Sequence, residues 1–127
     1  MTRLGALRAV RELAACSDRD ISSLLRYTDE VKVEGGELMA ERGRQCAAFV
    51  VVMEGRLRSD CGLLGPGDSH GWNEMWERAP NHATVVAESD ARILVVSHEQ
   101  FRAVKGLSRI QPPAPQEREA ERTSSAA

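Results

Sequence analysis

The sequence predicts a mainly β domain with flanking helices, arranged as a double-stranded β-helix, or jelly-roll, barrel. Two observations support this fold class. Short apolar runs are separated by glycine-rich turns through the middle of the chain, and helical periodicity is confined to its two ends. The chain has 127 residues, of which 42% are hydrophobic and 28% charged, and these ordinary values favour one globular domain.

Two short helices are expected before the strands begin. An apolar stripe starts at Leu4 and recurs at three- and four-residue steps as far as Ala14, as in an amphipathic helix. Ser17, followed three residues later by Asp20, predicts a capping box at the start of a second helix. We expect this second helix to end near Thr28.

From residue 31 onward the apolar period changes to the alternation typical of strands. The strongest strand signal is the continuous apolar run over 47–53, which indicates that both of its faces are covered. Glycines between the runs provide turns, because glycine reaches positive φ at no steric cost. The expected strands span residues 31–33, 37–40, 47–53, 56–58, 63–64, 82–87 and 91–96.

The last predicted element is a helix that begins after Ser97, where a second capping box is expected, and continues through Leu107. A proline cluster ends the regular structure, and the polar, charged residues beyond it predict disorder. The sequence therefore predicts a domain over residues 1–110 and a disordered tail over 111–127.

Charge and composition exclude several classes of function. The net charge of −2 argues against a nucleic-acid partner, because phosphate binding needs a basic face. No apolar run approaches the ~20 residues that span a bilayer, and the N-terminus lacks a signal-peptide pattern. Cys16, Cys46 and Cys61 are odd in number and widely spaced, which favours reduced thiols. We expect a cytoplasmic protein with no membrane partner, and Cys46 close to its core.

A series of short motifs follows a fixed order along the chain: Gly36-Glu37-Leu38, Glu41-Arg42-Gly43, Phe49-Val50-Val51-Val52, Glu54-Gly55, Leu64-Gly65-Pro66-Gly67-Asp68, Gly71, Ala83-Thr84-Val85-Val86-Ala87, Leu94-Val95-Val96 and Phe101. This series resembles the cyclic-nucleotide-binding domains of the catabolite activator protein and of the kinase A regulatory subunit. The resemblance covers most of the ordered chain. It implies a jelly roll with a role in regulation and signal transduction.

The resemblance also implies a binding site. In that family the segment after Gly71 forms a short helix whose backbone N–H groups hold a cyclic phosphate. A glutamate and an arginine complete the family's site, but Trp72 and Asn81 stand at those positions here. Losing such a charged contact in a buried site costs about 2–5 kcal/mol, and Trp72 has the bulk to fill the ribose volume. The candidate ligand-binding residues are Gly71, Trp72, Asn73, Arg78, Asn81, His82 and Ala83.

Two positions keep alternatives open. Arg78 and His82 could supply replacement contacts to a phosphate, which would make the domain a cAMP or cGMP sensor. Alternatively, Arg78 is a solvated loop charge and His82 an ordinary strand residue. Trp72 and Trp76 share a helix face and either cap the barrel as core or form an aromatic platform for a base or a partner peptide.

A metal enzyme of the cupin type is a third hypothesis. Residues 66–73 loosely resemble the second cupin motif, but a cupin site needs two histidines one residue apart and a glutamate on earlier strands, which the sequence lacks. We therefore expect no metal ligand at His70 and no catalytic residue, and we interpret His98 as a surface helix residue.

The leading hypothesis is a non-catalytic regulatory module with a degenerate nucleotide pocket. Because the predicted helix at residue 97 is followed closely by prolines, no output segment fits on the chain, and the module would act through a protein partner or a homo-oligomer. A cyclic nucleotide, cAMP or cGMP, is the possible ligand, and no other cofactor is expected.

Overall fold

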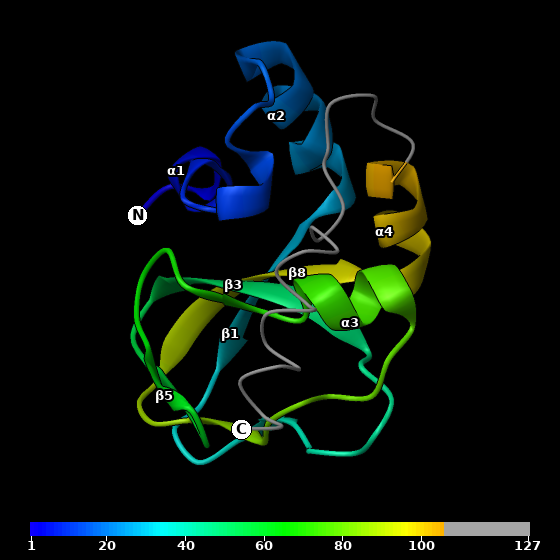
Figure 1. Cartoon of the computed structure of the whole chain (residues 1–127). Helices are drawn as coiled ribbons and strands as arrows, with labels where there is room; N and C mark the ends of the chain where they lie inside the picture. Colours follow the sequence, from blue (N-terminus) through cyan, green and yellow to red (C-terminus); the bar gives the residue numbers. More distant parts are fainter. Residues whose placement is uncertain (106–127) are drawn as a thin grey trace, which may run out of the picture.

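Two four-stranded antiparallel sheets form the body of the molecule, with most helices gathered at one end and one short helix beside the first sheet (Figure 1). The computed structural model describes residues 1–105. The first sheet has the order β1-β8-β3-β6 and the second β2-β7-β4-β5. The strands are β1 Asp29–Val33, β2 Leu38–Ala40, β3 Ala48–Glu54, β4 Leu57–Ser59, β5 Gly62–Leu64, β6 Ser69–His70, β7 Val85–Ala87 and β8 Ala91–Ser97. The predicted mainly β jelly-roll class is confirmed, although within residues 1–105 the two sheets do not close into a barrel.

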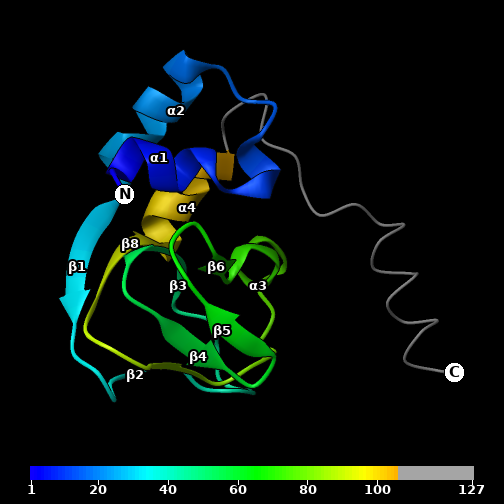
Figure 2. The same ribbon diagram turned by 90° about the vertical axis from the view of Figure 1, so that its left-hand side faces the viewer.

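Helices flank the sheets, as predicted. The α-helices are α1 Arg3–Arg8, α2 Asp18–Leu24, α3 Trp72–Glu77 and α4 His98–Lys105. Two 3-10 turns, η1 Arg11–Leu13 and η2 Leu25–Tyr27, follow α1 and α2. Figure 2 shows α1, α2 and α4 together at the end of the molecule opposite β2 and β4.

Both predicted capping boxes are present. The Ser17 hydroxyl accepts a hydrogen bond from the Asp20 N–H, and the Asp20 carboxylate accepts one from the Ser17 N–H. At the start of α4, Ser97 and Gln100 make the same reciprocal pair, with the Ser97 N–H donating to Gln100 Oε1 at 2.7 Å. These local bonds satisfy N–H groups that a helix start leaves without partners.

The first of the two predicted N-terminal helices, from Leu4 to Ala14, is interrupted, so the prediction of one continuous helix there was wrong. Its first part, α1, ends at Arg8, and Val10 then adopts an extended conformation with ψ of 119°. The chain resumes as the 3-10 turn η1. Because both pieces keep their apolar side chains on the covered face, Leu7, Val10 and Leu13 are all buried. The apolar spacing thus predicted the burial but not the break.

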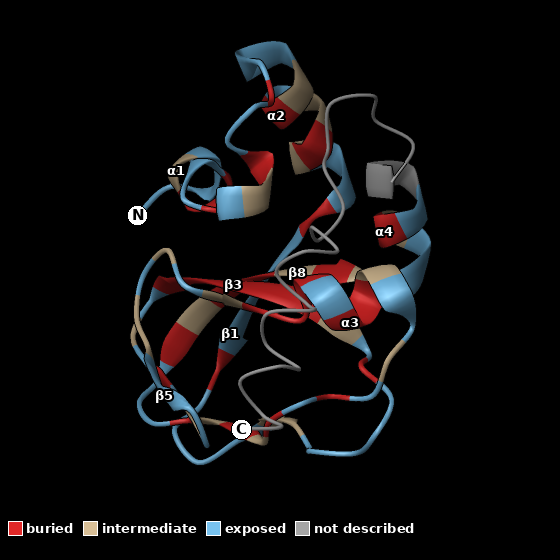
Figure 3. Ribbon diagram, viewed as in Figure 1, coloured by how far each residue is buried: buried red, intermediate tan, exposed pale blue. Residues whose placement is uncertain are grey.

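The strand β3 lies at the centre of the first sheet, between β8 and β6. Its side chains alternate, with Phe49 and Val51 on one face and Val50 and Val52 on the other. All four are buried (Figure 3), which confirms that this apolar run is covered on both faces.

Two hydrophobic cores cover those two faces. The core between the sheets joins residues of both, among them Val52 and Ile93 from the first sheet and Leu57 and Val85 from the second. The second core, which we call the helix-side core, lies on the other face of the first sheet, beneath the helices. It includes Leu7, Leu13, Ile21, Leu24, Phe49, Val51, Trp72, Met75, Leu94, Val96 and Phe101.

The remaining differences concern strand ends. The predicted strand over 82–87 begins only at Val85, and the two-residue strand β6 was not predicted. The domain end at residue 110 and the tail over 111–127 lie outside the described residues. Within residues 1–105, no helix combines the length and the apolar character that a bilayer crossing requires.

Candidate ligand-binding site

Gly71 makes the junction between β6 and α3. Its φ of 105° lies in the left-handed region that favours glycine. A Cβ atom at this position would lie 2.8 Å from the Ala48 carbonyl oxygen and 3.2 Å from Cys46 Sγ. Glycine is therefore required here both by the backbone conformation and by the close approach to β3. It allows α3 to start directly against the first sheet.

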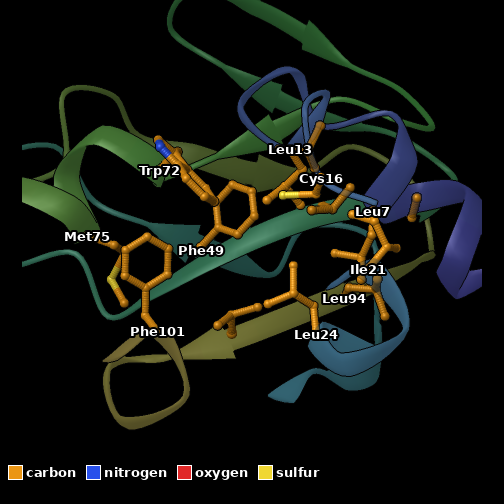
Figure 4. Close-up of a cluster of buried hydrophobic side chains, with 14 of the residues drawn as sticks. Leu7, Leu13, Cys16, Ile21, Leu24, Phe49, Trp72, Met75, Leu94 and Phe101 are labelled. Atoms are coloured by element: carbon orange, nitrogen blue, oxygen red, sulfur yellow. The ribbon is translucent and has the colours of Figure 1, made fainter. Parts of the chain in front are cut away.

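Trp72, which the resemblance places at the position of the family's glutamate, belongs to the helix-side core. Its side chain is packed edge-on against two phenylalanines, with ring centroids 5.3 Å from Phe49 and 5.2 Å from Phe101 (Figure 4). Trp72 is only 4% exposed, and its indole N–H is buried without a hydrogen-bond partner. Because Phe49 and Val50 face opposite sides of β3, this packing directs Trp72 away from the space between the sheets.

Trp76 lies beside Trp72 on α3. The two indole rings are stacked with centroids 6.0 Å apart and planes 23° apart, and Trp76 also meets Phe101 edge-on at 6.2 Å. Trp76 is partly buried and packs against the helix-side core. Of the two interpretations of this pair, the contacts favour core packing, although on the helix side of the first sheet and not across the open side of a barrel.

A polar cluster occupies the opposite side of β6 and α3. His70 is paired with Val50 across the β3–β6 ladder, so its side chain shares the face of β3 that looks toward the second sheet. Glu74, one turn along α3, and His82, just before β7, complete the group. The Glu74 Oε2 atom lies 2.7 Å from His82 Nδ1 and 3.7 Å from His70 Nε2. We call these three residues the His70–Glu74–His82 cluster.

Burial differs within this cluster. The side chains of His70 and Glu74 are 5% and 8% exposed, whereas that of His82 is 62% exposed. The imidazole rings of His70 and His82 are 5.4 Å apart. The cluster therefore has a buried base, formed by β6 and α3, and one solvent-facing edge, formed by His82.

Asn81, which the resemblance places at the position of the family's arginine, is bonded inside the protein. Its amide nitrogen donates to the Glu41 carbonyl at 3.1 Å. That bond fixes the orientation of the amide, so its Oδ1 faces His70 Nε2 at 3.2 Å. Asn81 is buried and links the loop before β3 to the His70–Glu74–His82 cluster.

Arg78 lies apart from this cluster. It ends α3 in the left-handed conformation, with φ of 57°, and is exposed. It lines a cavity of about 250 Å³ with Gln45, Met75, His98, Phe101 and Arg102. Of the two proposed replacement contacts, the structure brings His82 to the polar cluster and leaves Arg78 in another cavity.

The two remaining candidate ligand-binding residues, Asn73 and Ala83, make no contact with the polar cluster that the structure records. Asn73 is exposed on α3, and Ala83 is fully buried just before β7.

His98 is exposed at the start of α4, as expected, with its Nε2 2.7 Å from the Cys46 carbonyl oxygen. Cys46 is buried, as expected from its place near the core. Burial raises the pKa of its thiol, and the charge of Glu74 adds to the rise.

A larger hollow, of about 880 Å³, lies at the opposite end of the first sheet. It is lined by Lys32, Val33, Glu34, Glu54, Gly55, Asp90, Ala91 and Arg92. None of these residues belongs to the segment from Gly71 to Ala83. The hollow is thus distinct from the candidate site.

Sequence reasoning missed two members of the polar cluster, His70 and Glu74. Their spacing of four residues is no signal here, because His70 lies on β6 and Glu74 on α3, with Gly71 between the two elements. His70 was considered only against the cupin spacing, and Glu74 was not considered. The decisive fact is the pairing of β6 with β3, which turns His70 toward the space between the sheets.

Comparison with known proteins identifies the family. The family model described as the cyclic nucleotide-binding domain matches residues 30–105, more than half of the chain. No curated protein sequence matches the chain significantly.

Solved structures share the fold at low sequence identity. The N-terminal domain of a transcriptional regulator from Streptomyces coelicolor A3(2) is 22% identical, with a TM-score of 0.69 and 77% of each chain covered. The regulatory domain of Toxoplasma gondii PKA, crystallised with cAMP, is 22% identical, with a TM-score of 0.73. The catabolite activator protein of Thermus thermophilus is 21% identical, with a TM-score of 0.64. The matches cover 80% and 73% of this chain but only 42% and 48% of those two proteins.

Proposed function

The chain belongs to the cyclic nucleotide-binding domain family, a family of regulatory domains, and on this premise we propose that it is a non-catalytic module with a degenerate nucleotide pocket. In this proposal it acts in the cytoplasm through a protein partner and not through cAMP or cGMP. The loss of nucleotide binding and the action through a protein partner are what we propose beyond membership of the family.

The proposal rests on the contacts of Trp72 and Asn81, the two positions to which the resemblance assigns the family's nucleotide-binding glutamate and arginine. Trp72 packs edge-on against Phe49 and Phe101 in the helix-side core. The amide nitrogen of Asn81 donates to the Glu41 carbonyl, and its Oδ1 contacts His70 Nε2. Both side chains are buried in internal contacts, and neither carries a charge that could pair with a ligand.

Electrostatics supports the same conclusion. The Glu74 carboxylate is 8% exposed and lies on α3, the helix that the resemblance assigns to the cyclic phosphate. A phosphate brought to that place would meet a carboxylate of like charge in a partly dry environment, where repulsion is strong. Arg78, the arginine considered as a replacement contact, lines a different cavity and does not offset this repulsion.

A face for a protein partner is available on the second sheet. The ladders of β2, β7, β4 and β5 align Leu38, Val86, Arg58 and Leu63 in one row across the sheet. Their strand neighbours Leu57, Val85 and Ala87 point into the core, so this row points outward. Leu38 is 55% and Leu63 51% exposed. We expect the partner to cover this row, which has Leu38 and Leu63 at its two ends and Val86 and Arg58 between them.

The alternative is a genuine cAMP or cGMP sensor. Its replacement contact would come from His82, whose ring is 62% exposed at the edge of the polar cluster. A histidine there can donate to a phosphate, but it already contacts the Glu74 carboxylate at 2.7 Å. A nucleotide would have to compete with that contact, which makes the sensor the weaker hypothesis.

Calorimetric titration of the purified chain with cAMP and with cGMP tests the proposal. We expect no saturable heat up to about millimolar nucleotide, equivalent to a binding free energy weaker than about −4 kcal/mol. The thermal unfolding midpoint should also stay constant, because a ligand that does not bind the folded state cannot stabilise it. Micromolar binding that is lost in His82→Ala would establish the sensor instead.

A further inference from the structure

The donor atoms of the His70–Glu74–His82 cluster converge on one point from three elements. His70 comes from β6, Glu74 from α3 and His82 from the segment before β7. One ligand atom from each residue can be chosen so that all three lie within 4.8 Å of one another. Imidazole nitrogens together with a carboxylate oxygen form the ligand set that proteins use for divalent transition metals.

The separations within the cluster fit a bound ion. A tetrahedral site with ligand distances of about 2.1 Å places neighbouring ligand atoms about 3.4 Å apart. In the structure, Glu74 Oε2 lies 3.7 Å from His70 Nε2 and 2.7 Å from His82 Nδ1, values that bracket this distance. The exposed ring of His82 is the part that must move, and its exposure leaves it room to do so.

Asn81 closes one side of the cluster. Asn81 Oδ1 lies 3.2 Å from His70 Nε2, and the bond from its amide nitrogen to the Glu41 carbonyl holds it in that orientation. The other sides of the cluster are closed by protein, because His70, Glu74 and Asn81 are all buried. Solvent reaches it along His82, whose side chain is 62% exposed, so an ion has a route in.

We propose that the His70–Glu74–His82 cluster is a binding site for one divalent transition-metal ion of the Zn²⁺ class, with these three side chains as its ligands. The sequence predicted no metal ligand at His70, because the histidine spacing of the cupins is absent. The cluster instead combines one strand residue, one helix residue and one loop residue. A bound ion would connect β6 of the first sheet to the segment that enters β7 of the second.

This inference stands on the geometry of the cluster and does not depend on the proposed partner function. The nucleotide titration tests that function, and a metal titration tests the site. The chain can bind metal whether or not it binds nucleotide, so failure of the metal proposal and failure of the proposed function are distinguishable.

Tag-free full-length chain, treated with a chelator and then dialysed, should be titrated by calorimetry with Zn²⁺. Titration with Co²⁺ should be followed by absorption, since its visible bands report the ligand type and coordination number. The parent for the variants is Cys61→Ser, because Cys61 is an exposed thiol that could bind either ion. His82→Ala and Glu74→Gln remove one ligand each, and His98→Ala is the matched control, since His98 is exposed but lies outside the cluster.

We expect one equivalent of metal per chain and a cobalt spectrum of nitrogen and oxygen ligands. His82→Ala and Glu74→Gln should each weaken binding at least about tenfold, and His98→Ala should bind like the parent. Circular dichroism of the metal-free variants checks their folding; if Glu74→Gln does not fold, His82→Ala decides, because its side chain is largely exposed. The absence of stoichiometric binding, binding unchanged in His82→Ala, or a sulfur-to-cobalt charge-transfer band would overturn the proposal.

Discussion

The indole ring of Trp72 meets the phenyl ring of Phe101 edge-on, with centroids 5.2 Å apart and planes 77° apart. This contact joins α3 to α4 on the helix side of the first sheet. Trp72 is thus an anchor of the helix-side core. If it stands at the position of the family's glutamate, as the resemblance implies, that position serves packing in this chain.

Replacing Trp72 should therefore cost stability. Trp72→Ala removes the contacts with Phe49 and Phe101 and should lower the free energy of unfolding by about 3–5 kcal/mol. Trp72→Phe keeps an aromatic ring and removes an indole N–H that has no partner, so it should cost only about 1–2 kcal/mol. Trp76→Ala, at a partly buried site, should cost less than Trp72→Ala. Urea unfolding measures all three, and equal losses for the two alanine variants would argue against this role of Trp72.

Gly71 should be intolerant of any side chain. Gly71→Ala places a Cβ 2.8 Å from the Ala48 carbonyl oxygen at a φ of 105°. Gly36 is a matched control, because its φ is 92° and a Cβ there would meet nothing within 4 Å. Backbone strain alone should make Gly36→Ala cost about 1 kcal/mol, while strain and clash together should make Gly71→Ala cost at least about 2 kcal/mol. Chemical denaturation of both variants compares them, and the account is wrong if the two cost the same.

The thiols should differ in reactivity. Burial raises the pKa of the Cys46 thiol, with the charge of Glu74 as a further cause, and this disfavours the reactive thiolate. Cys16 is also buried, whereas Cys61 is exposed. A disulfide reagent should therefore modify one thiol quickly in the folded protein and the other two only on unfolding. Cys61→Ser should abolish the fast phase; a fast phase that survives in this variant would contradict the burial of Cys46 and Cys16.

Asp60 should make stability depend on acid pH. The Thr84 N–H, followed by the Arg42 guanidinium, lowers the pKa of its carboxyl group. Because the folded-state pKa is below the unfolded value of about 3.9, the stabilisation is present above that pH and is lost as pH falls through the folded pKa. Asp60→Asn should thus destabilise the protein at pH 7 and have little effect below both pKa values. Unfolding curves at the two extremes test this, and an equal effect at both would contradict it.

Much of the fold could be predicted because its signals are local. Both capping boxes depend on residues three apart, and the buried strand β3 shows in its own composition. The resemblance to the family added the short helix after Gly71. The break near Val10 could not be predicted, because the apolar spacing is the same for one helix and for a helix followed by a 3-10 turn.

The candidate site was less predictable because its geometry depends on distant pairing. His70 faces the space between the sheets only because the two-residue strand β6 pairs with Val50 and Val51 of β3. Glu74 reads as an ordinary charged residue on a short helix until that pairing brings it to His82. The orientation of Trp72 has the same origin, since Gly71 sets how α3 leaves the sheet. No pattern within a few residues carries this information.

The most direct test of the central claim is an NMR titration of the isotopically labelled full chain with cAMP, observing the backbone amides. The account predicts that the amides from Gly71 to Ala83 keep their positions up to about millimolar nucleotide, because Trp72 and Asn81 are committed to internal contacts. Saturable shifts confined to Gly71–Ala83 would contradict the account and identify the segment as a working nucleotide pocket.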